Sequence, residues 1–205
     1  STRLGVSPWI NLAIGLAITV GSALILSWIT LRMSGHYLPL ATIAWCLALN
    51  YTMANVSWLG KFDGILGVPP IELFGTPLTQ GRSIYYLIWV IALLAAVALL
   101  HLLDSRTGRA IRALKGGVTM AEAMGVPTFR YKVIVFVVAA VLASLSGWLF
   151  AHFQRTVNPS PFGIKFGIEY LFMAVIGGVG YVWGAFAGAA VVKLIEDQLQ
   201  VLLPR

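Results

Sequence analysis

The residues that could carry catalysis are few in this chain and far apart. Metal sites use clustered histidine, cysteine or acidic side chains, and acid–base catalysis commonly uses paired carboxylates. The 205-residue sequence has three histidines, His36, His101 and His152, in separate segments, and one cysteine, Cys46. Carboxylates do not pair at a useful spacing within its hydrophobic segments. We therefore expect no metal site and no catalytic residue, and a protein that is not an enzyme.

A glycine-rich run, GGVG at residues 177–180, is the segment most like a phosphate-binding loop. A nucleotide-binding loop needs a Lys followed by Ser or Thr after the glycines, in a turn from a strand to a helix. Here Tyr181 and Val182 follow instead. We expect this chain to bind no ATP and no other cofactor itself.

The charged residues gather in one segment. Six of the fourteen Lys and Arg residues lie in residues 104–132, where only Asp104 and Glu122 oppose them. The six are Arg106, Arg109, Arg112, Lys115, Arg130 and Lys132. An excess of Lys and Arg in a short loop between apolar segments marks the cytoplasmic side of a membrane protein. The sequence therefore predicts a cytoplasmic loop over residues 104–130.

The composition identifies the solvent in which the chain folds. Hydrophobic residues make up 59% of it and charged residues 10%, against about 25% charged in soluble domains. The net charge of +7 could indicate a nucleic-acid partner, but the basic residues flank apolar runs and form no single exposed stripe, so we expect contact with membrane lipid instead. The sequence predicts an all-α bundle that crosses the membrane several times, with residues 1–205 in one domain.

Five apolar segments could cross a bilayer, which takes about 20 residues. Four are continuous, at about 9–31, 37–58, 84–103 and 131–153. The fifth, 169–203, contains Gly177, Gly178 and Gly180, each of which lowers helix propensity by about 1 kcal/mol relative to Ala. We expect a broken helical hairpin here, and a single glycine-rich helix is the alternative.

Small residues recur at every fourth position in two of these segments. They are Ala139, Ala143, Gly147 and Ala151, and then Gly180, Gly184 and Gly188. Small side chains at this spacing let helix backbones approach closely in lipid. The spacing predicts close helix packing and says nothing about a substrate.

Two short helices are expected within the basic loop. Thr119 and Glu122 have the spacing of a capping box, and Gly125 followed by Pro127 is typical of a helix end. Before them, TGRAIRALK predicts a helix that exposes Arg109, Arg112 and Lys115. Such helices could dock a cytoplasmic partner or rest on anionic headgroups, and the residues alone favour neither interpretation.

Two runs of this chain resemble the permease subunits of branched-chain amino-acid ABC transporters, the LivM-type family. They are GRAIRALKGGVTMAEAMGVPTFRYKVIVFVVAAVLASLSGWLFAH and NPSPFGIKFGIEYLFMAVIGGVGYVWGAFAGA. Upstream, SGHYLPLATIAWCLALN and FDGILGVP are similar more loosely, because the family usually reads near GGSDGL where this chain has GKFDGIL. The resemblance covers about residues 32–203. It implies further helices before Ser1 and after Arg205.

The resemblance also implies partners and roles for residues. ATP-binding subunits would carry ATP and magnesium, a sister permease would complete a heterodimer, and an external solute-binding protein would deliver cargo. The segment expected to couple to the ATPase is Thr119, Met120, Ala121, Glu122, Ala123, Met124 and Gly125, with Glu122 as its polar contact, and with basic contacts from Arg109, Arg112 and Lys115. Asp63 and Gly64 would lie on the external face, where cargo is delivered. Arg155 and Asn158, in the external loop over residues 154–168, could contact either the solute or the solute-binding protein.

The transport path and the cargo are less well marked. Asn50 and Asn55 either bond between helices or line the path, and the backbone of Gly177, Gly178 and Gly180 would meet a zwitterionic solute. The resemblance implies import of leucine, isoleucine or valine through a bacterial inner membrane, with urea or short amides as an alternative cargo. A secondary transporter normally has ionisable residues at mid-membrane. The sequence does not favour one, and a channel that needs no ATPase also stays open.

Overall fold

The computed structural model of the chain is almost entirely helical, and it describes residues 7–32, 37–57, 60–73, 76–77 and 81–202. The α-helices are α1 (Pro8–Thr30), α2 (Tyr37–Asn55), α3 (Gly81–Asp104), α4 (Arg106–Lys115), α5 (Val118–Ala123), α6 (Thr128–Gln154), α7 (Ile164–Gly177) and α8 (Val182–Leu202). The strands are β1 (Ile65–Leu66), β2 (Glu72–Leu73), β3 (Thr76–Pro77) and β4 (Thr156–Val157), and the 3₁₀ turns are η2 (Lys61–Asp63) and η3 (Ser160–Phe162). His36, Trp58 and Leu203 lie outside the described residues.

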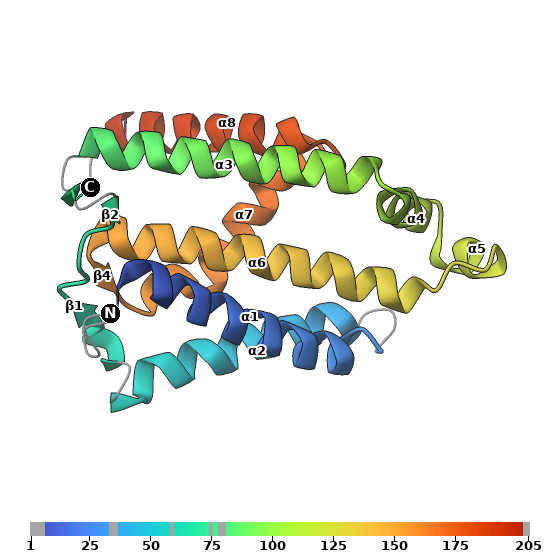
Figure 1. The fold of residues 1–205 in the computed structure, drawn as a ribbon, viewed down its shortest axis with the longest axis horizontal. Helices are drawn as coiled ribbons and strands as arrows, with labels where there is room; N and C mark the ends of the chain where they lie inside the picture. Colours follow the sequence, from blue (N-terminus) through green and yellow to red (C-terminus); the bar gives the residue numbers. More distant parts are fainter. Residues whose placement is uncertain (1–6, 33–36, 58–59, 74–75, 78–80, 203–205) are drawn as a thin grey trace.

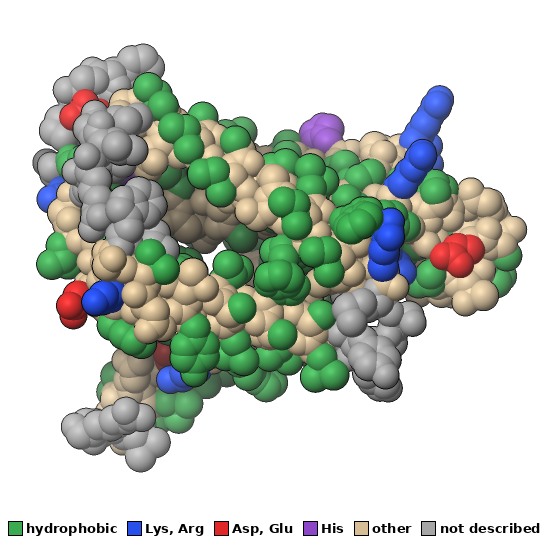
Figure 2. Space-filling model, turned by 90° about the horizontal axis from the view of Figure 1, so that it is seen from below, with side chains coloured by type: hydrophobic (Ala, Val, Ile, Leu, Met, Phe, Trp, Pro, Cys, Tyr) green, Lys and Arg blue, Asp and Glu red, His purple; other side chains and the backbone are tan. Residues whose placement is uncertain are grey.

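The long helices run along the same axis and give the molecule two distinct ends (Figure 1). The described start of α1, the short strands and the end of α8 lie at one end, and α4 and α5 lie at the other. We call these the strand end and the α5 end. Hydrophobic side chains cover the long helices between the two ends, and Lys and Arg lie toward the ends (Figure 2). This distribution matches a bundle whose middle faces lipid.

Three described helices, α1, α3 and α6, are long and apolar enough to cross a membrane. The pair α7 and α8 also passes this test and is bent by 118° at its break. The predicted broken hairpin is therefore confirmed, and the alternative of one glycine-rich helix is wrong. The helix α2 forms where a span was predicted, but its asparagines make it less apolar and it is not in this set.

The strand end is fastened by bonds between segments far apart in the sequence. β1 pairs antiparallel with β4, so Ile65 lies opposite Val157. The indole of Trp9 donates to the carbonyl of Glu72 at 3.0 Å, and that of Trp148 donates to the carbonyl of Pro8 at 3.1 Å. Ile71 is buried in a small core with Trp148. These contacts fix the N-terminal half of α1 against the C-terminal half of α6.

The α7–α8 junction depends on glycine for two separate reasons. Gly178 and Gly180 have φ values of +92° and +107°, which L-residues with side chains rarely adopt. A Cβ on Gly184 would meet the carbonyl of Gly177, and a Cβ on Gly188 would meet that of Met173. The close packing predicted for this glycine series is thus confirmed at Gly184 and Gly188.

The other predicted series of small residues packs less tightly. No described atom lies within 4 Å of the position that a Cβ on Gly147 would take. Ala139 and Ala143, on the same series, are exposed. Close helix packing is therefore not seen along this face of α6.

We predict that Gly184→Ala lowers the thermal unfolding temperature of the protein in detergent. The new methyl group has no room against the α7 backbone, and overpacking of this kind costs about 1–3 kcal/mol. Gly147→Ala is the matched control, because it gains helix propensity without meeting any described atom. Unfolding of Gly184→Ala at or above the temperature of Gly147→Ala would show that the two helices do not approach as described.

Candidate functional site

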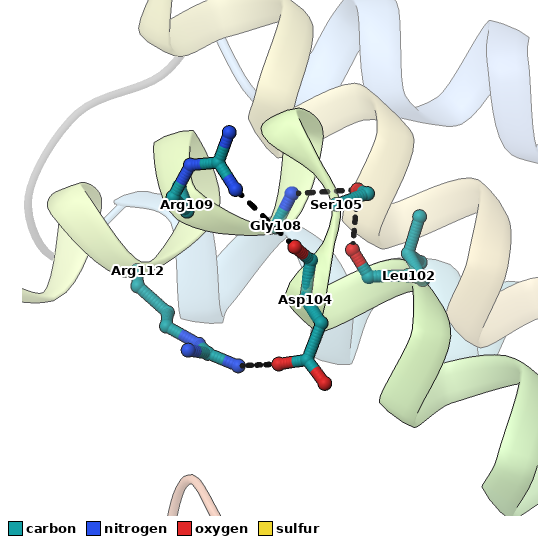
Figure 3. Close-up of polar contacts among 6 residues, drawn as sticks. All are labelled: Leu102, Asp104, Ser105, Gly108, Arg109 and Arg112. Atoms are coloured by element: carbon teal, nitrogen blue, oxygen red, sulfur yellow. Dashed lines mark hydrogen bonds and ion pairs between the residues drawn. The ribbon is translucent and has the colours of Figure 1, made fainter.

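The α5 end begins where α3 passes into α4, at Ser105. The hydroxyl of Ser105 donates to the carbonyl of Leu102 at 2.6 Å and accepts the backbone N–H of Gly108 at 3.2 Å (Figure 3). One side chain therefore satisfies a carbonyl in the last turn of α3 and an N–H in the first turn of α4. The sequence expectation of a short helix in this region is confirmed, with its start at Arg106.

Gly108 holds α4 directly against the end of α3. It is buried, and a Cβ on it would meet the carbonyl groups of Leu102 and Leu103. No other residue type fits this contact without moving one helix. The angle at which α4 leaves α3 is therefore set by backbone packing at a single glycine.

The basic residues of α4 are exposed, as predicted, and two of them bond within the chain. Arg112 forms an ion pair with Asp104 at 2.9 Å, and Arg109 donates to the backbone carbonyl of Asp104 at 3.3 Å (Figure 3). Both positive charges lie by the C-terminal end of α3, where the helix dipole favours them. The exposed pair contributes at most about 1 kcal/mol. The basic side chains thus help to orient α4 and remain open to a partner.

The third basic residue, Lys115, lies beside the glycine break. A Cβ on Gly180 would stand 3.4 Å from the Nζ atom of Lys115. The last residue of α4 therefore reaches the turn between α7 and α8. This places one of the predicted basic contacts beside the predicted broken hairpin.

The capping box predicted at Thr119 and Glu122 is wrong. α5 begins at Val118 with Gly117 as its N-cap and has no capping side chain, so Thr119 lies inside the helix. The Glu122 carboxylate instead accepts a hydrogen bond from the Thr128 hydroxyl at 2.6 Å. Thr128 is the first residue of α6, so this bond ties α5 to the start of a membrane span.

The predicted end of α5 at Gly125 is confirmed. Gly125 has φ +78°, and its N–H bonds to the carbonyl of Glu122 at 2.9 Å. The N–H of Val126 bonds to the carbonyl of Ala121 at 3.0 Å. These two bonds form a Schellman motif, the usual way in which a helix closes on glycine. The connection to α6 therefore has one defined backbone path.

α5 presents apolar side chains beyond the bundle. Ala121 is buried at 2% exposure, whereas Met120 and Met124 are 64% and 75% exposed. The helix projects past the ends of the long helices (Figure 1). Methionine is flexible and polarisable, and it is common at surfaces that adapt to a partner. The arrangement is a small exposed apolar surface next to the exposed basic residues of α4.

The predicted external residues come together at the strand end. A Cβ on Gly64 would meet the carbonyl of Val157 and would stand 2.9 Å from the Cβ of Asn158. The carbonyl of Arg155 accepts the N–H groups of Gly67 and Val68, each at 3.1 Å. Asp63 is exposed in η2. Three of the four predicted residues thus lie around the β1–β4 pairing, at the end of the molecule opposite α5.

The residues predicted for the path have varied surroundings. Asn50 donates to the carbonyl of Pro159 at 3.1 Å, so it bonds between elements, as the packing alternative predicts. Asn55 donates to Tyr51 in its own helix at 2.8 Å. Gly177 lies at the α7–α8 crossing, and Gly178 and Gly180 form the turn. Whether any of them lines a path stays a prediction.

Sequence reasoning missed one group of polar residues at the strand end. Asn11, Ser144, Trp148 and His152 line a cavity of about 340 Å³ between α1, α6 and β1. The signal was the spacing of Ser144, Trp148 and His152, which recur every four residues and so share one face of α6. The contribution of α1 was not visible, because Asn11 lies more than 130 residues away in the sequence.

We predict that Gly108→Ala releases α4 and α5 from the bundle. The methyl group would press on the last carbonyl groups of α3, and a strain of about 1–3 kcal/mol corresponds to about 5- to 150-fold faster amide exchange. Hydrogen exchange over residues 106–126 measures it. Gly116→Ala is the control, since its Cβ would meet its nearest atom at an ordinary 3.5 Å. Equal exchange in the two variants would contradict the role of Gly108.

The chain is similar in sequence to known transport permeases. The chain is similar to LivH of Escherichia coli K12, a high-affinity branched-chain amino acid transport system permease protein, at 30% identity over 151 residues, 73% of this chain and 48% of LivH. It is similar to LivM of Salmonella typhimurium at 23% over 219 residues, 95% of this chain and 51% of LivM. The ribose import permease RbsC of Haemophilus influenzae is 25% identical over 178 residues, 76% of this chain and 55% of RbsC.

The chain spans about half the length of the curated relatives it matches. No solved structure is a significant match. A family described as the permease component of branched-chain amino acid transport systems matches residues 1–204. By this match over nearly its whole length, the chain belongs to the family of branched-chain amino acid transport system permease components.

Proposed function

We propose that this chain is part of the membrane-spanning subunit of an ABC importer, and that α5 docks on a separate ATP-binding subunit. The observation that carries the proposal is the projecting helix α5 with its exposed Met120 and, at its C-cap, the exposed Met124. This six-residue helix and its C-cap gain little from the rest of the chain, because only the Ala121 side is buried. Its apolar surface fits a hydrophobic groove on a partner.

The connections of α5 fit the task of transmitting force. On one side, α4 is packed against the end of α3 through Gly108. On the other side, the carboxylate of Glu122 accepts a hydrogen bond from Thr128, the first residue of α6. A partner that moves α5 would therefore act on two spans at once. ATP hydrolysis with magnesium on the partner would supply the energy, and α5 would transmit the motion to α3 and α6.

The two spans have room to move relative to each other. Apolar cavities of about 320 and 430 Å³ lie between α3 and α6, lined by residues such as Ile91, Ala95, Leu142 and Leu145. α1 packs against α6 along much of its length. α3 is therefore separated from a unit formed by α1 and α6. Alternating access needs such a division between elements that move apart.

The orientation follows from charge. Lys and Arg concentrate in the segment that contains α4 and α5, so this end lies in the cytoplasm of a bacterial cell with the subunit in the inner membrane. The strand end then faces outward, where Asp63, Gly64, Arg155 and Asn158 would meet an external solute-binding protein. A sister permease subunit would complete the membrane part of the importer.

The cargo that we propose is a branched-chain amino acid. LivH and LivM are named for such transport, and both match this chain over most of its length. RbsC, which is also similar to this chain, is named for ribose import, so sequence similarity to these permeases does not by itself identify the cargo. The cavity at the strand end, which His152 lines, gives a physical reason to prefer an amino acid.

We predict that the double change Met120→Asp and Met124→Asp in the full-length protein abolishes co-purification of its ATP-binding subunit from detergent. Burying one methionine contributes about 1.5–3 kcal/mol, so replacing two with charges is expected to weaken the complex at least about a hundredfold. Thermal stability of the subunit itself is expected to stay unchanged, because both side chains are exposed.

Leu66→Asp is the matched control for that experiment. Leu66 is 71% exposed, like the methionines, and lies at the opposite end of the molecule. The control is expected to retain the ATP-binding subunit. Retention by the double variant would contradict docking through α5, and an unaltered protein that never associates with an ATPase would favour a channel or a secondary transporter.

A further inference from the structure

We propose that the cavity at the strand end binds the transported solute as a zwitterionic amino acid with a branched aliphatic side chain. This inference rests on the proposed transport function and adds a site to it. The cavity measures about 340 Å³, which is at the lower end of the range for small-molecule sites, about 300–1,000 Å³. It combines a few polar groups with apolar walls, as such sites do.

His152 supplies a hydrogen-bond acceptor to this cavity. The ring is 1% exposed, and its Nδ1 atom lies 2.8 Å from the carbonyl oxygen of Pro69. A carbonyl oxygen only accepts, so Nδ1 carries the proton, and the neutral ring has its lone pair at Nε2. Among the described residues Nε2 has no hydrogen-bond partner. A lone pair of this kind suits the ammonium group of an amino acid.

Two neutral donors lie in the same cavity. The Oγ atom of Ser144 accepts from the Thr19 hydroxyl at 3.3 Å, which leaves the proton of Ser144 to donate. The side-chain amide of Asn11 has no hydrogen bond within the described part of the chain. Neutral donors can hold a carboxylate without burying a charge of their own while the cavity is empty. A passing solute is then bound weakly enough to leave.

The rest of the lining is apolar and excludes other solute classes. Leu12 comes from α1, Val68 follows β1, and Ile65 and Val157 come from the paired strands. The Trp148 indole N–H is already bonded to the carbonyl of Pro8, so Trp148 offers only its ring. A sugar, with hydroxyls on every face, would leave several of them against these walls without partners. Urea would leave the apolar part unfilled.

The position of the cavity agrees with a site for entering solute. Its strand wall is the β1–β4 pair, and Gly64 packs on Val157 in that pair. The cavity is therefore next to the surface at which the solute-binding protein is proposed to deliver cargo. The strands β1 and β4 that line it lie at the end of the molecule opposite α5 (Figure 1).

A diazirine analogue of leucine tests this site in the purified full-length protein, with and without its ATP-binding subunit and in the absence of ATP turnover. We expect light to attach the analogue to peptides that contain Asn11 and residues 144–152. Excess leucine is expected to suppress the labelling, whereas ribose and urea are not. His152→Asn keeps a donor for the Pro69 carbonyl and removes the Nε2 acceptor, so it is expected to reduce labelling about tenfold, the loss of one hydrogen bond to a charged group.

Two further variants make the result decisive. Asn11→Leu removes the amide and keeps a side chain of similar size. It is expected to reduce labelling as His152→Asn does. This variant keeps the test valid if His152→Asn fails to fold. His101→Asn is the control, because His101 is an exposed histidine bonded to its own helix at Val97. Labelling elsewhere, labelling that leucine does not suppress, or equal labelling in Asn11→Leu and His101→Asn would overturn the site.

The labelling is independent of the ATP-binding subunit, so the two proposals fail separately. If no specific labelling occurs but the ATPase complex forms, the solute site is wrong and the importer proposal holds, with the solute taking another path. If specific labelling occurs but the protein never binds an ATPase, the solute site is supported and the importer proposal is wrong.

Discussion

The contact between Gly108 and the last carbonyl groups of α3 is the constraint on which the α5 end depends. Without a side chain at Gly108, α4 can turn directly off α3, and α5 then lies beside the first turn of α6. The bond from Thr128 to Glu122 closes this path. Each joint is small, but together they connect two spans through one short exposed helix. A bulkier residue at Gly108 would lengthen the path and weaken that connection.

The α7–α8 hairpin depends on a second constraint. A helix break leaves backbone N–H and C=O groups that need hydrogen-bond partners. Irregular backbone at membrane depth is tolerated only when protein covers it or water reaches it. The buried Gly184 and Gly188 bring α8 onto α7, and Lys193 joins them by bonding Glu169 at 2.7 Å and Glu196 at 2.6 Å. Lys193 thus pairs with one carboxylate on α7 and one on its own helix, α8. This arrangement fits a structural role better than the free ionisable group that ion coupling requires.

The features that the sequence predicted depend on residues close together in the chain, and the cavity that it missed depends on residues far apart. The spans, the break near Gly178 and the end of α5 at Gly125 are set by neighbours within a few residues, so hydropathy and glycine positions were enough. The capping box failed because Glu122 has a tertiary partner, Thr128, that competes for its carboxylate. The cavity was missed because Asn11 and His152 meet only after α1 packs on α6. Local patterns cannot report such a meeting.

The helix α6 links the two ends of the molecule and unites these features. Thr128 at its start bonds to α5, and His152 near its end lines the proposed solute site. At 1.5 Å per residue these positions are about 36 Å apart along a continuous helix. α1 packs along α6, so the two helices that line the cavity belong to one unit. A tilt of that unit against α3, driven from α5, would therefore move the two helical walls of the proposed site together.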